Sequence, residues 1–264
     1  MNILGIHGGF YIGQHDASVT LIQNGKVTFS VEEERLIKVK SPRGVEPVEG
    51  VRQALKNSNL DIKDIDYISH PGSTYKDIKA RLKSFFIHYF GYCPKIEIVN
   101  HQLSHLASSY FYSGFSSATC ISYDAYGDRL SGAIAIAKNN KIKILKEISL
   151  DNSLGSYYAL FTNYLGFDVA EDEYKVMGMA AYGKKNYNIE KVLSLKNNDY
   201  FKLNNSFLNR TKSSPTGNNQ GPFYSSKLVK LLGNPRKREE KFNQRHFDIA
   251  KSVQEHLENA CIRV

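Results

Sequence analysis

Residues 17–33, ASVTLIQNGKVTFSVEE, decide the fold expected for the first half of the chain. Apolar and polar residues alternate on both sides of Asn24-Gly25, a dipeptide that favours a two-residue hairpin turn. Because an apolar run at residues 2–7 precedes this hairpin, we expect the chain to open with three strands. The pattern then predicts the order αβαβα, with a helix at 47–57, a strand at 66–69, a helix at 75–89, a strand at 95–99 and a helix at 101–112.

The opening of three strands is expected to recur in the second half. Residues 118–124 form a buried apolar run, residues 125–128 a polar loop, and residues 131–138 and 141–149 two further strands around Asn139-Asn140. A doubled βββαβαβα unit is typical of the α/β actin-like ATPase (ribonuclease H-like) fold. In that fold two lobes face each other, and the loop between the first two strands of each lobe approaches the phosphates.

The second lobe is expected to be incomplete. A helix at 153–165, a polar stretch at 186–221 and a last helix from about residue 242 follow its strands, but no closing βαβα is visible. We therefore expect a complete first lobe at 1–116 and a partial second lobe at 117–264, with the polar stretch as an insertion. A truncated chain and a lobe that closes with fewer strands both fit this pattern.

Composition narrows the class of protein. The chain has 264 residues, of which 41% are hydrophobic and 23% charged, as in ordinary globular proteins. Its three widely spaced cysteines support neither a disulfide framework nor a thiolate zinc site, so a reducing cytoplasm is expected. No run of about 18 apolar residues is present, so no membrane span is expected.

The net charge of +9 comes entirely from the last third of the chain, where residues 184–264 hold 16 basic and 7 acidic side chains. The run Asn234-Pro-Arg-Lys-Arg238 has the charge to bind phosphates. Glu239 and Glu240 interrupt it, however, and no ladder of aromatic residues accompanies it. A solvated surface is therefore favoured over nucleic-acid binding.

Two histidines lie one helical turn apart in His101-Gln-Leu-Ser-His105. Side chains at i and i+4 share a helix face, so both imidazoles can reach one metal ion. This spacing alone more often marks an exposed pair, but the pair directly follows an expected strand. Asp124 ends the first strand of the second half, at a loop expected to face the same cleft. His101, His105 and Asp124 are therefore candidate ligands of a divalent metal with open positions for substrate.

A second candidate site follows the glycine-bearing loop at residues 8–13, where positive φ allows backbone N–H groups to approach an anion. His15, Asp16 and Ser18 come directly after it. His15 has the chemistry of a general base for a hydroxyl or of a hydrogen-bond donor to phosphate. Without further context, a turn capped by Asp16 is the preferred interpretation.

Two charged segments leave alternatives open. Residues 32–35, EEER, precede Lys38 and Lys40. They form either a solvated strand end or a set of carboxylates that holds an arginine and a lysine toward an anionic substrate. Residues 172–183, DEYKVMGMAAYG, surround Lys175 with small residues. They form either a segment whose backbone can come close to a ligand or a tightly packed helix.

Five segments in order resemble one known family between residue 1 and about residue 185, and a sixth near the C-terminus resembles it loosely. The family is the O-carbamoyltransferases of nodulation-factor and antibiotic biosynthesis, of the NodU/CmcH type. The five segments are HDASVTLIQNGKVTFSVEEERLIKVK (15–40), NHQLSHLASSYF (100–111), SYDAYGD (122–128), SLGSYYALFTNYLGF (153–167) and EYKVMGMAAYG (173–183), and the loose one is FDIAKSVQEHLE (247–258).

The resemblance implies an N-terminal domain that moves a carbamoyl group from carbamoyl-adenylate to a hydroxyl of a small molecule or glycan. A C-terminal domain would make that adenylate from carbamoyl phosphate and ATP. By the same resemblance, His101, His105 and Asp124 match metal ligands, usually of iron, while His15 matches the base and Lys40 an active-site lysine. The nucleotide or carbamoyl-adenylate is expected to contact six residues: Asp16, Ser18, Gly127, Glu173, Lys175 and Gly178.

This sequence departs from the family pattern in three places. The fourth metal ligand, an aspartate of the second lobe, has no counterpart, and neither does the glycine-rich segment that holds the adenosine. The adenylate-forming domain is absent, so a companion chain is expected to supply the missing half. Two alternatives stay open: a catalytically incomplete remnant that binds metal or nucleotide, and another metal-dependent actin-like transferase. The EEER and EYKVMG segments argue against the latter.

Overall fold

The structure is a computed structural model that describes residues 1–11, 14–195, 200–209 and 222–264. These residues divide into two units, Met1–Gly114 and Phe115–Val264. Residues 12 and 13 of the predicted glycine-bearing loop lie outside the described residues, as do residues 196–199 and 210–221 of the predicted polar insertion.

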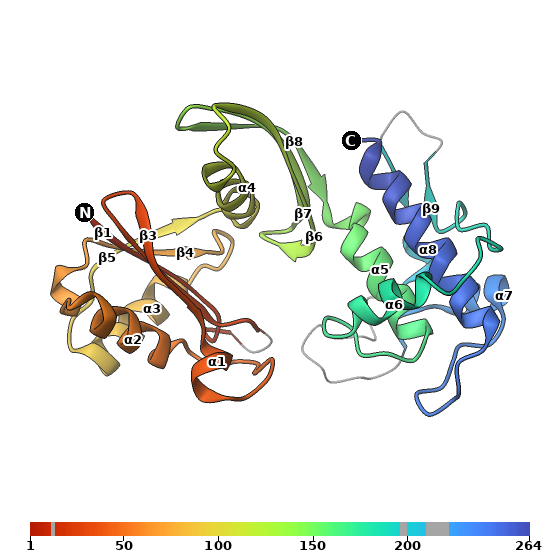
Figure 1. Cartoon of the computed structure of the whole chain (residues 1–264), viewed down its shortest axis with the longest axis horizontal. Helices are drawn as coiled ribbons and strands as arrows, with labels where there is room; N and C mark the ends of the chain where they lie inside the picture. Colours follow the sequence, from red (N-terminus) through yellow and green to blue (C-terminus); the bar gives the residue numbers. More distant parts are fainter. Residues whose placement is uncertain (12–13, 196–199, 210–221) are drawn as a thin grey trace. The chain divides into compact units, whose positions relative to one another are not determined.

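A five-stranded sheet forms the centre of the first unit (Figure 1). Its order is β3-β2-β1-β4-β5. The first three strands pair antiparallel, whereas β1, β4 and β5 pair parallel. The strands are β1 (Asn2–His7), β2 (Ser18–Gln23), β3 (Lys26–Glu32), β4 (Tyr67–Pro71) and β5 (Lys95–Val99). This arrangement is that of a complete actin-like lobe, so the predicted fold class is confirmed.

The predicted hairpin turn joins β2 to β3. Asn24 has a φ of 50° and Gly25 a φ of 80°. Positive φ at both central positions is the conformation that matches the twist of the flanking strands, and Asn and Gly adopt it readily. The turn therefore fixes which side chains of β2, Val19 and Leu21 among them, face the core.

Helices connect the strands of the first unit. These are the short α1 (Glu33–Ile37), α2 (Val48–Ser58), η1 (Ile62–Asp64), α3 (Ile78–Phe90) and α4 (His101–Tyr112). Helices α2 and α3 bury Val51, Leu55, Leu82 and Phe86 against Leu4, Ile6, Val19, Leu21 and Ile68 of the sheet. Helix α4 begins directly after β5, at the residue that the sequence predicts.

The EEER segment is only partly a solvated strand end, because Glu32 and Arg35 are exposed but Glu33 is not. It turns into α1, and Glu33 is only 1% exposed. The Glu33 carboxylate accepts hydrogen bonds from the backbone N–H groups of Glu49 and Gly50 at 2.9 and 2.7 Å, which satisfies two donors in the first turn of α2. Glu32 and Glu34 pair with Arg35, so two of the three carboxylates contact the arginine.

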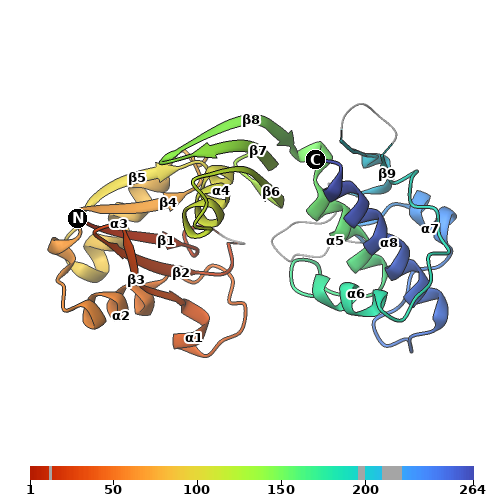
Figure 2. The same cartoon turned by 45° about the horizontal axis from the view of Figure 1, so that its top comes forward.

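Three antiparallel strands open the second unit, as predicted (Figure 2). They are β6 (Ser117–Gly127), β7 (Leu130–Lys138) and β8 (Lys141–Ser149), in that order across the sheet. Among the described residues no further strand joins β6 on its other edge. In the first unit, β1 has the parallel strand β4 at the corresponding place.

Helices form the core of the second unit, after a short η2 (Leu150–Asn152). They are α5 (Leu154–Tyr164), α6 (Glu173–Ala180) and α8 (Gln244–Ile262). Helix α5 is buried on nearly all sides. Its Tyr157 donates a hydrogen bond to the carbonyl of Val253, and its Tyr158 donates one to the Gln254 side chain, so two neighbouring hydrogen bonds join α5 to the middle of α8.

The described part of the predicted polar insertion takes part in this core. It contains β9 (Leu193–Ser194), β10 (Lys202–Leu203) and η3 (Asn205–Phe207), and α7 (Ser226–Leu232) follows it. Its apolar residues Ile189, Val192, Leu193, Phe201, Leu203, Phe207 and Leu208 are all buried in the core cluster. Residues 186–195 and 200–209 are therefore polar in composition, but these apolar residues anchor them in the core.

The basic run near residue 236 is only partly a solvated surface. Arg236 is 8% exposed and donates to the carbonyls of Leu165, Arg238 and Glu240. Arg245 donates to the carbonyls of Leu232 and Asn234 and to the Tyr164 hydroxyl. Both guanidinium groups thus donate hydrogen bonds to backbone carbonyls where α5 and α7 end. The net charge of the segment does not predict this structural role of arginine.

Replacing Glu33 by alanine should destabilise the first unit. The change leaves the N–H groups of Glu49 and Gly50 without their present acceptor, and such buried donors cost about 1–3 kcal/mol. Urea unfolding of the full chain measures this free energy. Glu32→Ala is the matched control, since its exposed ion pair is worth at most about 1 kcal/mol. Equal midpoints for the two variants would contradict this role of Glu33.

Candidate active site

The histidine pair lies on the first two turns of α4. The Asn100 side chain caps this helix by accepting a hydrogen bond from the Leu103 N–H at 3.0 Å. His101 is the first helical residue, and the Nε2 atoms of His101 and His105 are 3.0 Å apart. His101 is half-buried and His105 is exposed.

This separation tests whether the pair suits a metal. Two bonds of about 2.1 Å that meet at a right angle place their nitrogens about 3.0 Å apart. The observed distance therefore fits two neighbouring positions of one octahedral ion. Imidazole nitrogen suits iron, zinc and other divalent transition metals, so His101 and His105 fit the ligand type that the sequence predicts.

His15 and Asp16 form the second part of the site. Nδ1 of His15 lies 2.6 Å from the Asp16 carboxylate. A proton on Nδ1 is held by this contact, which leaves Nε2 with a lone pair that can accept a proton. Asp16 has a φ of 58°, a conformation that aspartate tolerates better than most residues. Both side chains are exposed, as a group that meets a substrate must be.

The glycines before His15 approach the chain's own backbone. Gly8 and Gly9 have positive φ, as predicted. A Cβ on Gly8 would lie 2.4 Å from the Cα of Ala17, and one on Gly9 would lie 2.3 Å from the carbonyl oxygen of Val45. Close packing of the loop is therefore a sufficient reason for glycine at both positions. The predicted approach to an anion is not required to account for them.

His7 is a member of this site that sequence reasoning missed. It ends β1 and lies opposite Ser18 of β2. Its Nδ1 atom is buried and has no hydrogen-bond partner among the described residues. Burial is the main reason that the pKa of His7 falls to about 4, and the imidazoles of His101, His15 and His105 act in the same direction. The only sequence signal for His7 is its place at a strand end, the feature that also singles out Asp124.

The structure thus brings His15, His101 and His105 together around His7 in the first unit. Ser18 begins β2 beside them, and Lys40 lies exposed in the segment after α1. The other predicted residues lie in the second unit on two separate segments. Asp124 and Gly127 belong to the end of β6, whereas Glu173, Lys175 and Gly178 belong to α6.

The predicted residues on α6 have local partners. The Lys175 ammonium group pairs with Asp172 at 2.7 Å. The Glu173 carboxylate accepts a hydrogen bond from the Ala170 N–H at 2.8 Å. Gly178 has open space where a Cβ would lie, so helix packing does not require a glycine there.

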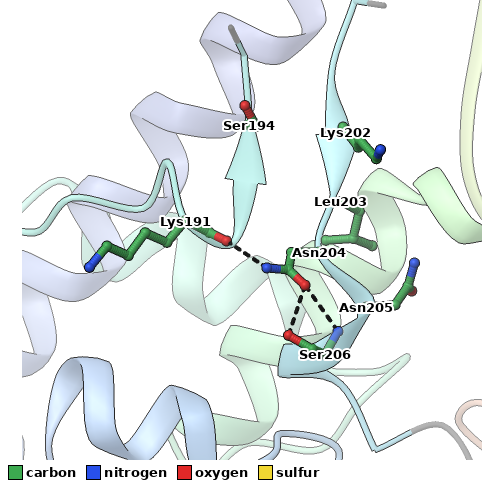
Figure 3. A pocket seen from close by; sticks show the side chains of 7 residues that line it. All are labelled: Lys191, Ser194, Lys202, Leu203, Asn204, Asn205 and Ser206. Carbon is green, nitrogen blue, oxygen red and sulfur yellow. Dashed lines mark hydrogen bonds between the residues drawn. The ribbon is translucent and has the colours of Figure 1, made fainter. Parts of the chain in front are cut away.

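Two depressions in the surface lie away from the predicted residues. One of about 390 Å³ in the first unit is lined by Gly9, Glu46, Arg81 and His88, among others. One of about 450 Å³ in the second unit lies beside β9 and β10 (Figure 3). In the second depression the side chains of Lys191 and Lys202 point away from each other, so they do not form one anion site.

Comparison with known proteins identifies the family. The family described as Carbamoyltransferase N-terminus matches residues 2–91 and 80–264. The chain therefore belongs to this family, and the resemblance seen in its motifs is confirmed.

Two curated relatives cover nearly the whole chain. The Uncharacterized protein sll1178 of Synechocystis is 28% identical over 100% of this chain and 47% of its own length. The Nodulation protein NolNO of Sinorhizobium fredii is 29% identical over 95% of this chain and 38% of its own length. The chain therefore spans less than half the length of these relatives. Among solved structures, YeaZ from Pseudomonas aeruginosa matches with a TM-score of 0.36 and 13% identity, over 57% of this chain and 68% of that one.

None of the described helices combines the length and the apolar character needed to cross a membrane.

The pKa of His7 predicts how stability depends on pH. In the unfolded chain His7 takes up a proton near its ordinary pKa of 6.5, whereas the folded form does so only near 4. Between these values the unfolded state binds more protons, so His7 stabilises the fold fully above pH 6.5 and progressively less as the pH falls toward 4. The full loss corresponds to about 3 kcal/mol.

Urea unfolding of the wild type and of His7→Gln at several pH values checks this. The free-energy difference between the two proteins should shrink as the pH falls from 7 to 4.5. The His88→Gln variant is the control, because it removes an exposed imidazole from another helix of the same unit. A difference that does not change with pH would show that His7 can be protonated in the fold.

Proposed function

We propose that this chain is the transfer half of an O-carbamoyltransferase. In this proposal it moves a carbamoyl group from carbamoyl-adenylate to a hydroxyl group of a small molecule or glycan. The match of nearly the whole chain to the carbamoyltransferase N-terminus family carries the proposal. The contact between His15 and Asp16 and the His101–His105 pair support it, because they supply a base and ligand atoms in one unit.

The proposed metal ligands are His101, His105 and Asp124. Each offers one ligand atom of a type that divalent transition metals accept, and the family resemblance favours iron. A bound divalent ion would neutralise the adenylate phosphate and make AMP a better leaving group. The distance between the two Nε2 atoms supports the histidine part of this set.

His15 is the proposed general base. Its Nε2 takes the proton of the acceptor hydroxyl as the hydroxyl oxygen forms a bond to the carbamoyl carbon. The bond between that carbon and the phosphate oxygen breaks, and AMP leaves with the electron pair. Asp16 stabilises the resulting imidazolium through the contact at Nδ1. Lys40 is proposed as a cationic group of the same active site, and its exposed side chain is free to meet a ligand's negative charge.

The proposed nucleotide contacts are Asp16, Ser18, Gly127, Glu173, Lys175 and Gly178. The local ion pair of Lys175 and the local hydrogen bond of Glu173 mean that α6 must exchange these partners to bind a ligand. The open space at Gly178 leaves room for close approach. Of these six, Asp16 and Ser18 lie beside the base in the first unit.

The donor and the compartment complete the proposal. Carbamoyl phosphate and ATP would be converted to carbamoyl-adenylate by polypeptide that corresponds to the part of the relatives that this chain does not cover. Cys93, Cys120 and Cys261 form no disulfide, which fits a reducing compartment such as the cytoplasm.

A second candidate is a remnant that binds metal or nucleotide without turnover. The unpaired edge of β6 among the described residues favours it. Carbamoyl transfer from carbamoyl phosphate and ATP, assayed with and without the remaining part of a relative, separates the two candidates. Transfer that requires both polypeptides supports the enzyme, and none under either condition supports the remnant.

Metal content tests the ligand set. The purified chain, loaded with Fe²⁺ without oxygen and then dialysed, should retain about one ion, and His105→Ala should retain much less because one inner ligand is lost. His88→Ala is the matched control, since it removes an exposed imidazole of α3 from another part of the same unit. Equal iron in all three proteins would exclude the site.

Turnover tests His15. In the complemented enzyme, His15→Ala should lower kcat by about 10²–10⁴-fold, the usual contribution of a positioned base, and should leave the metal content unchanged. The same assay on Asp16→Asn should show a smaller loss, because Nδ1 keeps a neutral acceptor. Near-normal turnover of His15→Ala would remove His15 from the mechanism.

A further inference from the structure

The segment that carries Asp124 lies at an irregularity in the pairing of β6 with β7. Strands β6 and β7 are in register up to Tyr123, which lies opposite Gly132, and pair again where Gly127 lies opposite Leu130. Residues 124–126 between them fall outside the ladder. A carboxylate on such a segment needs another support if it is to stay in one place, since ligand groups must be held within a fraction of an ångström.

The first turn of α5 provides that support. Ser153, the residue that caps α5, is completely buried. Its hydroxyl group lies 3.1 Å from the Asp124 carbonyl oxygen and 2.8 Å from that of Ala125, and it donates to them. The same oxygen accepts a hydrogen bond from the Ser156 N–H at 2.9 Å. One hydroxyl thus fixes both carbonyl groups next to the Asp124 side chain.

Gly155 allows the helix to come this close. A Cβ on Gly155 would lie 2.5 Å from the Cα of Ala125 and 2.6 Å from its nitrogen, which is closer than real Cβ atoms approach. The N–H of Ala125 in turn donates to the Asp124 carboxylate at 2.6 Å. Because α5 packs directly on Ala125, it also fixes the N–H group that binds the Asp124 carboxylate.

We propose that Ser153 and Gly155 are positioning residues for the Asp124 carboxylate, and that this explains the SLGS part of the 153–167 segment. The proposal rests on the proposed function, in which Asp124 is a metal ligand. Groups that orient a ligand without touching the metal typically change metal affinity by 10- to 100-fold. Ser153 and Gly155 act through the backbone of residues 124 and 125 and do not themselves contact the metal or the substrate.

Titration of the full chain with Co²⁺, followed by calorimetry and by the visible absorption of the bound ion, tests the proposal. Ser153→Ala should weaken Co²⁺ binding at least tenfold, and Ser153→Thr should restore it because the hydroxyl group is kept. Ser225→Ala is the matched control: Ser225 caps α7, so its loss removes a helix cap of the same kind far along the chain. It should leave the affinity unchanged.

Gly155→Ala provides a second variant in which stability and positioning change in opposite directions. Alanine has a higher helix propensity than glycine, so the intrinsic stability of α5 rises, yet the added Cβ pushes against Ala125. Co²⁺ binding should again weaken at least tenfold, with a shifted absorption spectrum. Thermal unfolding of each variant confirms that the second unit is folded.

The outcomes separate this proposal from the proposed function. If Asp124→Ala binds Co²⁺ as the wild type does, Asp124 is no ligand and the proposed metal set fails together with this inference. If Asp124→Ala binds weakly but Ser153→Ala and Gly155→Ala bind normally, the metal set stands and the positioning role is overturned. If Ser153→Ala and Ser225→Ala lose the same affinity, the effect is general destabilisation, and the positioning role is again overturned.

Discussion

The parallel strands β1, β4 and β5 run in the same direction, so their carboxyl ends meet at one edge of the first unit's sheet. This constraint brings together side chains that are about a hundred residues apart in sequence, His7 at the end of β1 and His101 directly after β5. The antiparallel strand β2 adds His15 and Asp16 where it begins beside β1. Binding at the carboxyl edge of parallel strands is a general property of open α/β sheets.

Some charged residues of the motifs are candidates for contact with a ligand, whereas others hold the backbone of the chain in place. In EEER, the buried Glu33 caps α2, and its own N–H bonds to the carbonyl of Ala17, next to Asp16. In the basic run, the arginines satisfy helix carbonyls. Motif residues therefore cannot be assigned to a ligand from charge alone. In this chain the charged side chains of Glu33, Arg236 and Arg245 hold backbone groups of other segments in place.

Much of the fold was predictable because it depends on local periodicity and turn chemistry. The Asn24-Gly25 turn, the start of α4 at His101 and the bounds of β8 follow from the sequence directly. The structure of residues 186–195 and 200–209 was not predictable, because their buried residues pack in one cluster with residues of α5 and α8 that are far away in the sequence. The same holds for α1, where tertiary hydrogen bonds of Glu33 outweigh the strand pattern that precedes it.

The site was predictable to a similar extent. Helical spacing identified His101 and His105, and the position directly after the glycine-bearing loop identified His15 and Asp16. His7 was not predicted because its importance arises from strand order, which brings distant imidazoles near it and buries its Nδ1 atom. No spacing rule contains that information, since the strands that define the edge are separated by long connections.

The burial of α5 on nearly all sides has a consequence for the order of events during synthesis. Its partner α8 lies far along the chain, and the hydrogen bond from Tyr157 to Val253 spans 96 residues. The first unit can complete its sheet as soon as β5 has left the ribosome, whereas α5 emerges long before the helix that covers it. Until α8 follows, the nascent second unit exposes Tyr157, Phe161 and Leu160 to water. Chaperones that bind apolar segments have their longest opportunity in that interval.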